Sequence, residues 1–262
     1  MHTIPELIAA FRKETEHLRS MAQKLEYPWK PEGDNPRALH NNYARNLVTC
    51  YVSKFSDLSD GLLDAIEKRN YLVYALTGRA MIENVATLRY YIEHHYRPIF
   101  DKKSLTPEDM QKLIEVDDKH LRGSRFDWES FLFRRYDKLK DDAVRHLKDK
   151  EHKKKSIVDG MIQEQVNVLT CIEKWASQTP EVLIAYNLFC DLVHPNIGSS
   201  FLVSSISLGD LYFSRFKGEP VGRSIFDQSF PVLVSVTNKP FGEQLMMLIG
   251  TIWQDDELKK KA

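Results

Sequence analysis

Five polar residues on two apolar segments are the part of this sequence with the clearest capacity for chemistry. Arg79 and Glu83 interrupt the apolar stretch "YLVYALTGRAMIENVATLRYYI", and Asp191, His194 and Asn196 lie in or just after the end of another, "EVLIAYNLFCDLVHPN". Arginine can hold a phosphate through two parallel hydrogen bonds, and histidine exchanges protons near neutral pH because its ordinary pKa is about 6.5. These residue types together predict a polar site that binds an anion or moves a proton.

The spacing of these residues predicts which side chains meet. Arg79 and Glu83 are four residues apart, so they share one face of a helix, and Asp191 and His194 share a face for the same reason. An isolated buried charge is costly, so we expect the two helices to pack with Arg79 against Asp191. Glu83 would then lie near His194, and Asn196 would border the same site.

Two interpretations of this site are open. In the structural one, Arg79 and Asp191 form an internal salt bridge, and His194 is favoured by the dipole at the end of its helix. In the functional one, Arg79 stabilises the charge that develops on a phosphate while His194 transfers a proton, as metal-independent RNA cleavage requires. Residue types alone favour the structural interpretation, because ion pairs also shift pKa values without any catalysis.

Capping signals and apolar periodicity predict a chain that is almost entirely helical. Thr3 and Glu6 form a capping box that begins the first helix. The segments 70–97 and 181–194 are apolar on nearly every side, which is typical of fully buried helices. Further helices are expected from residue 4 to before Pro28, within 37–68 (one or two helices), from 107, from 127 into the lysine-rich run, and at 157–175, 222–237 and 241–258.

Only one region has the alternating pattern of strands. The segments "FLVSSISL" and "LYFSRF", joined through Gly209-Asp210, predict a β-hairpin near residues 201–216. We therefore expect an all-α fold: a helical bundle with long antiparallel helices and one small hairpin, in a single domain over residues 1–262. The apolar run "LMMLIGTIW" near the end of the chain suits core packing and a dimer interface equally well.

Composition and missing motifs exclude several classes of function. Lysine plus arginine equals aspartate plus glutamate at 37 each, so no global charge draws the chain to nucleic acid or membrane. No apolar run is long enough to span a membrane, and the first residues lack a signal-peptide pattern. Three dispersed cysteines indicate reduced core thiols of a cytoplasmic protein. Glycine-rich nucleotide motifs and zinc-ligand spacings are absent, so no cofactor and no metal are expected.

The two apolar segments also carry a family resemblance. The helix "GRAMIENVATLRYY", with Arg-x-x-x-Glu, and the later helix end "CDLVHPN" resemble HEPN-like helical proteins, over about residues 55–200. This resemblance implies a helical core with an N-terminal extension at 1–54 and a C-terminal hairpin and helices at 201–262. It also implies a homodimer in toxin–antitoxin or phage-defence settings. Active members are metal-independent ribonucleases with Arg and His on one helix, whereas here the helix before His194 has no arginine.

Residues 134–155 form a locally basic segment, "RRYDKLKDDAVRHLKDKEHKKK". It could contact the phosphates of RNA, with Lys153, Lys154 and Lys155 as the nucleic-acid-binding residues, or it could be a solvated helix face held by pairs of opposite charge. We expect an intracellular HEPN-like module that binds a protein, RNA or a nucleotide in bacterial defence or stress. The alternative is a metal-independent endoribonuclease that uses Arg79 and His194.

Overall fold

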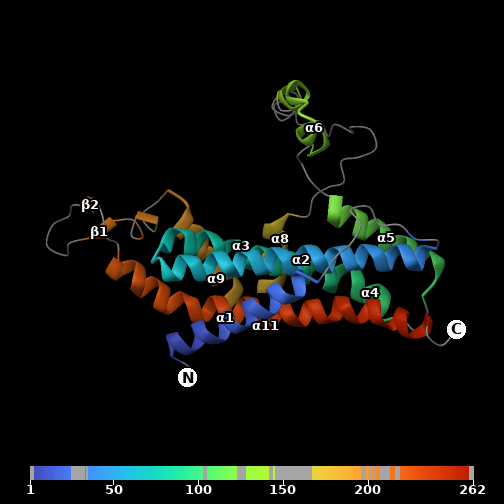
Figure 1. Cartoon of the computed structure of the whole chain (residues 1–262), viewed down its shortest axis with the longest axis horizontal. Helices are drawn as coiled ribbons and strands as arrows, with labels where there is room; N and C mark the ends of the chain where they lie inside the picture. Colours follow the sequence, from blue (N-terminus) through green and yellow to red (C-terminus); the bar gives the residue numbers. More distant parts are fainter. Residues whose placement is uncertain are drawn as a thin grey trace.

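The part of the chain that the structure describes is built almost entirely from α-helices, as the sequence predicts (Figure 1). The computed structural model describes residues 3–24, 33, 35–102, 105–122, 128–141, 144, 167–195, 199–200, 202, 204–206, 213–215 and 219–259. The elements are α1 (Ile4–Ala22), α2 (Pro36–Glu67), α3 (Tyr71–Tyr91), the π-helix η1 (Ile92–Tyr96), α4 (Arg97–Phe100), α5 (Pro107–Arg122), α6 (Trp128–Leu132), α8 (Val168–Ala176), α9 (Glu181–Val193), β1 (Ser204–Ile206), β2 (Phe213–Arg215) and α11 (Glu219–Lys259).

Helix starts follow the capping residues in the sequence. The capping box of α1 is confirmed: the Thr3 amide donates to the Glu6 carboxylate at 2.8 Å, and the Thr3 hydroxyl accepts from the Glu6 amide. Asn35 accepts from the amide of Ala38 and begins α2, which is one continuous helix. At α5, the Asp109 amide donates to the Thr106 hydroxyl, so Thr106 is the cap that the sequence indicates.

Helices α2, α3 and α11 run side by side along the long axis of the molecule (Figure 1). Ion pairs between α1 and α2 join Arg12 to Glu67 and Arg19 to Asp60, so these two helices are antiparallel. The helix α9 is antiparallel to α3, because Phe189 lies against Gly78 while the earlier Tyr186 reaches Glu83. This order brings the two most apolar segments of the sequence into contact.

One hydrophobic core joins helices from both ends of the chain. Phe11 of α1 meets Phe230 of α11 edge to face, and Phe55 of α2 stacks on Phe241 of α11 with ring centroids 4.0 Å apart. Tyr74 of α3 is fully buried and shares a hydrogen bond with Ser229 of α11. The core therefore includes the N-terminal helix and the C-terminal helix together with α3, α8 and α9.

The C-terminal region differs from the prediction, since the expected helices at 222–237 and 241–258 are one helix. Pro231 and Pro240 lie inside α11 without ending it. A proline in a helix costs up to about 3 kcal/mol, but the buried residues follow a single helical stripe through both prolines. That stripe is Phe226, Phe230, Leu233, Thr237, Phe241, Leu245, Leu248 and Ile252. Continuous burial explains why the helix does not break.

The expected long helix from residue 127 is interrupted in the part that is described, and the helical backbone resumes at residues 136–141. α6 ends at Leu132, and Arg134 has a left-handed backbone with φ of 56°. The amide of Arg135 donates to the carbonyl of Ser130 at 2.7 Å, which is the bond that closes a helix end of this kind. In α8, Asn167 caps the helix so that it begins at Val168; the earlier part of the predicted helix lies outside the described residues.

In the region expected to form a hairpin, two three-residue strands pair in antiparallel register, Ser204 with Arg215 and Ile206 with Phe213. Gly209 and Asp210 lie outside the described residues. Among the cysteines, Cys171 is buried, Cys190 is half-buried and Cys50 is exposed, so the expectation of three core thiols is wrong for Cys50.

Candidate functional site

Arg79 and Glu83 form the ion pair that their spacing predicts. The Nε of Arg79 donates to Oε1 of Glu83 at 2.9 Å, and each side chain is 29% exposed. The hydroxyl of Tyr186, from α9, donates to the same carboxylate oxygen at 3.1 Å. The guanidinium of Arg79 also lies 5.7 Å from the centre of the Tyr186 ring, within the range of a cation–π contact. This cluster of three side chains lies at the seam between α3 and α9.

Tyr186 is held in its neutral, donating form. Burial, a hydrogen bond with Cys190 and the charge of Glu83 raise the pKa of Tyr186 to about 12. At neutral pH the hydroxyl is therefore protonated and can only stabilise the Glu83 carboxylate. The cluster binds two helices together and holds one arginine in a fixed position.

Gly78 sets how closely the two helices approach. A Cβ at this position would lie 2.5 Å from a ring carbon of Phe189 and 3.1 Å from a methyl group of Leu233. Only a residue without a side chain allows α9 to pack this near to α3. The close approach fixes the register in which Tyr186 reaches Glu83.

Asp191 and His194 do not complete the predicted buried site, because both are exposed. Asp191 is about 140° around the helix from Tyr186, on the outer side of α9. His194 is five residues past Phe189, which lies at the level of Gly78, so it is displaced by about 7.5 Å along the helix axis. The predicted pairing of Arg79 with Asp191 is therefore replaced by Glu83 on its own helix and Tyr186 across the seam. Asn196, Lys153, Lys154 and Lys155 lie outside the described residues.

The outer faces of α3 and α9 expose large apolar side chains, which contradicts the prediction that both helices are buried on all sides. We call this surface the α3/α9 face. It contains the Arg79–Glu83 pair at its seam and the exposed side chains of Val73, Leu76, Leu183, Ile184 and Leu188. Apolar surface gathered on adjacent helices is typical of an interaction site. The sequence could have indicated this exposed apolar surface, because α9 has more apolar positions than one buried face of a helix requires.

A second polar cluster, which the sequence analysis missed, lies between α2, η1 and α5. His40 and Asp117 are fully buried, with Nδ1 of His40 2.8 Å from Oδ2 of Asp117. The hydroxyl of Tyr96, on η1, donates to the other carboxylate oxygen of Asp117. Burial raises the pKa of Asp117 to about 6, although the hydrogen bond and the charge of His40 oppose the rise. We call these three residues the His40–Asp117–Tyr96 network.

Next to this network, the rings of Tyr51 and Tyr91 surround His120. Tyr51 shares a hydrogen bond of 2.6 Å with Nε2 of His120, and the Tyr91 ring packs against the imidazole edge to face. Burial, assisted by the nearby His95, lowers the pKa of His120 to about 3, so this histidine is neutral at physiological pH. The contacting residues of these two clusters are 21 to 77 positions apart in the sequence, so no local motif reveals them.

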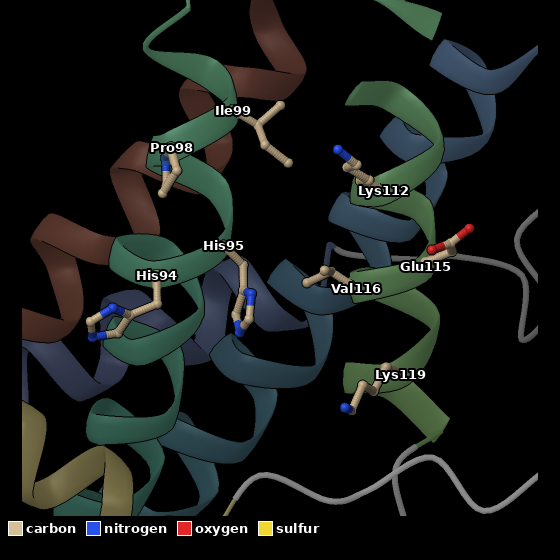
Figure 2. Close-up of a pocket in the computed structure, with 8 residues that line it drawn as sticks. All are labelled: His94, His95, Pro98, Ile99, Lys112, Glu115, Val116 and Lys119. Atoms are coloured by element: carbon tan, nitrogen blue, oxygen red, sulfur yellow. The ribbon is translucent and has the colours of Figure 1, made fainter. Parts of the chain in front are cut away.

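A groove opens beside the network, between η1 with α4 on one side and α5 on the other (Figure 2). Its volume is about 390 Å³, which is within the range of small-molecule sites. Across the part of the chain that the structure describes, no group of histidine, cysteine and carboxylate side chains is placed to hold a metal ion. Within the same residues, none of the helices has the length and apolar content of a membrane span.

Comparison with known proteins adds no relative: no family model, no curated protein and no solved structure matches this chain. The HEPN-like resemblance therefore rests on the sequence pattern alone.

Proposed function

We propose that this chain is a HEPN-like interaction module that forms a homodimer through the α3/α9 face. The observation that carries the proposal is the exposure of Leu76, Leu183, Ile184 and Leu188 on adjacent helices that otherwise pack into the core. Burying such apolar surface against a second copy would remove it from water at about 25 cal/mol per Å². The most apolar helices of the chain would then contribute to both the core and the interface.

The Arg79–Glu83 ion pair at the seam of the α3/α9 face favours a second copy of this chain as its partner. Arg79 and Glu83 place one positive and one negative charge side by side at the seam. A two-fold axis that passes between Arg79 and Glu83 brings Arg79 of one copy toward Glu83 of the other, so this ion pair is complementary to itself. A strongly charged partner would leave one member of this pair opposed to a like charge.

The wider setting of the proposal comes from the family resemblance. The resemblance implies an intracellular protein of bacterial defence or stress response. RNA would be a further ligand, bound through Lys153, Lys154 and Lys155. The three cysteines are free thiols, which fits a reducing compartment such as the cytoplasm. A helical bundle of HEPN-like architecture is part of the same proposal.

The alternative, an endoribonuclease that uses Arg79 and His194, is not favoured by the geometry. Arg79 is paired with Glu83 and lies over Tyr186, while His194 is exposed further along α9. Incubation with mixed RNA in EDTA separates the two functions. The proposed module leaves the RNA intact, whereas EDTA-resistant cleavage that His194→Ala abolishes would establish the nuclease.

The homodimer is tested by measuring molar mass with light scattering. We expect the wild type to have twice the mass of its 30.5 kDa chain, and Ile184→Asp to shift it to the monomer. Ile184 is 68% exposed, so the substitution leaves the core intact. Met246→Asp is the matched control, because Met246 on α11 is 61% exposed but lies outside the α3/α9 face. A wild type that remains monomeric at its highest soluble concentration would refute the proposal.

A further inference from the structure

The groove between η1 and α5 has a basic rim over an apolar floor. Lys112 and Lys119 lie on α5 two turns apart, which places them about 10 Å from each other along one side of that helix. Figure 2 shows both amino groups extending toward the gap between the helices. Val116 lies between them, and Ile99 of α4 extends toward it from the opposite wall. The groove therefore offers two cations and an apolar surface within one opening.

His95 adds a titratable group to the opposite wall. It extends from η1 into the groove, whereas Glu115, the acidic residue among those that line the groove, points away from it (Figure 2). His94, also on the rim, is directed away from α5. Burial lowers the pKa of His95, and the charges of His94 and Lys119 lower it further. The electrostatic potential at this wall is therefore positive, and a bound anion would reduce the repulsion between the positive groups.

The walls of the groove are held in place by the buried network behind them. His95 faces the groove, while the next residue, Tyr96, turns inward and donates to Asp117. On α5, Val116 faces the groove and the following Asp117 faces His40. π-helical turns such as η1 are frequent at functional sites. A wall fixed in this way loses little freedom when a ligand binds.

We propose that this groove binds a small phosphate monoester that carries an apolar or aromatic group. The phosphate lies between Lys119 and His95, and the apolar group lies on Val116 and Ile99. Lysine binds phosphate as a point charge, and a neutral histidine that gains a proton on binding adds a second charge-assisted hydrogen bond. This site is on different elements from the α3/α9 face and does not depend on dimerisation.

Phenyl phosphate is the probe that combines both parts of the predicted ligand, and inorganic phosphate and phenol each supply one part. Titration calorimetry on the full chain is expected to show saturable binding of phenyl phosphate, at least tenfold tighter than of inorganic phosphate, with phenol bound more weakly still. Equal affinity for phenyl phosphate and inorganic phosphate would remove the apolar part of the proposal. Absence of saturable phenyl phosphate binding would overturn the proposal that the groove binds a phosphate monoester.

Variants assign the binding to the groove. Lys119→Gln is expected to weaken phenyl phosphate binding about tenfold, the loss of one charge-assisted hydrogen bond. Lys239→Gln is the matched control, since Lys239 is an exposed lysine of α11 with a nearby carboxylate. Binding should also raise the pKa of His95, as followed by the NMR shift of its imidazole. Equal effects of the two variants, or an unchanged His95 titration, would show that the ligand binds elsewhere.

Discussion

Tyr186 takes the place that the sequence predicted for Asp191 and His194, since its ring lies beside Arg79 and its hydroxyl donates to Glu83. The expectation that Arg79 and Glu83 share a face is confirmed by their 2.9 Å ion pair. Their partner across the helices was not predicted, because a tyrosine within an apolar segment does not stand out in the sequence as a partner for charged groups. A half-exposed ion pair needs less compensation than a buried one, so a single donor, the hydroxyl of Tyr186, is enough.

Removing the Tyr186 hydroxyl tests whether its hydrogen bond to Glu83 stabilises the packing of α9 against α3. In Tyr186→Phe the ring still fills its place, but the hydrogen bond to Glu83 is lost, so we expect the free energy of unfolding to fall by about 1 kcal/mol. Urea denaturation followed by circular dichroism measures the change. Tyr136→Phe is the control, because Tyr136 is exposed, and it should have almost no effect. Equal stability of the two variants would mean that the Tyr186 hydroxyl contributes nothing.

The His40–Asp117–Tyr96 network predicts a dependence of stability on pH. The pKa of Asp117 is raised by burial from 3.8 to about 6, so between these values the folded state binds more protons than the unfolded state. The contribution of Asp117 is therefore full below pH 3.8 and is lost as the pH rises through about 6.

Asp117→Asn tests this dependence, because asparagine keeps the shape of the neutral carboxyl group but cannot ionise. As the pH rises from about 4 to about 6, we expect the wild type to lose stability relative to the variant. The measurement is the difference in free energy of unfolding between the two proteins at several pH values. A constant difference across this range would show that Asp117 ionises in the folded state at its ordinary pKa.

At the scale of single elements, helix starts and several helix ends were predictable: the expected ends at 68, 175 and 194 lie within one residue of the ends of α2, α8 and α9. Thr3, Thr106 and the proline at 180 mark starts through local hydrogen bonds or a fixed backbone angle. Whether a helix continues through a proline depends on burial against other helices, which a local rule does not include. Pro231 and Pro240 were therefore misjudged as the boundary between two helices, although the 3.6-residue pattern of buried residues runs through both.

The packing of α3 against α9 predicts opposite effects for two glycine substitutions. Gly78→Ala places a methyl group 2.5 Å from the Phe189 ring, so we expect a loss of about 1–3 kcal/mol despite the better helix propensity of alanine. Gly242→Ala, in α11, meets nothing within 4 Å and should gain roughly 0.5–1 kcal/mol. Thermal unfolding compares the two variants. A stabilising Gly78→Ala would show that the helices are not in close contact there.

At the scale of the whole molecule, capping signals and apolar periodicity predicted the all-α class but did not predict which side of each apolar helix is buried. A helix whose sequence is apolar on nearly every side can lie wholly inside the core, or it can lie half in the core and half at an interface. The structure shows that α9 is buried on one side only, because that side carries Val182, Phe189 and Leu192 and the opposite side exposes Leu183, Ile184 and Leu188. The neutral net charge of the chain places no long-range repulsion between two copies.

Covalent footprinting at increasing protein concentration tests self-association through this face most directly. If the chain dimerises through the α3/α9 face, labelling of Leu183, Ile184 and Leu188 falls as the concentration rises through the dimerisation range, while labelling of Met246 on α11 stays constant. Labelling of Leu183, Ile184 and Leu188 that does not change with concentration, or that falls no more than at Met246, would contradict dimerisation through this face.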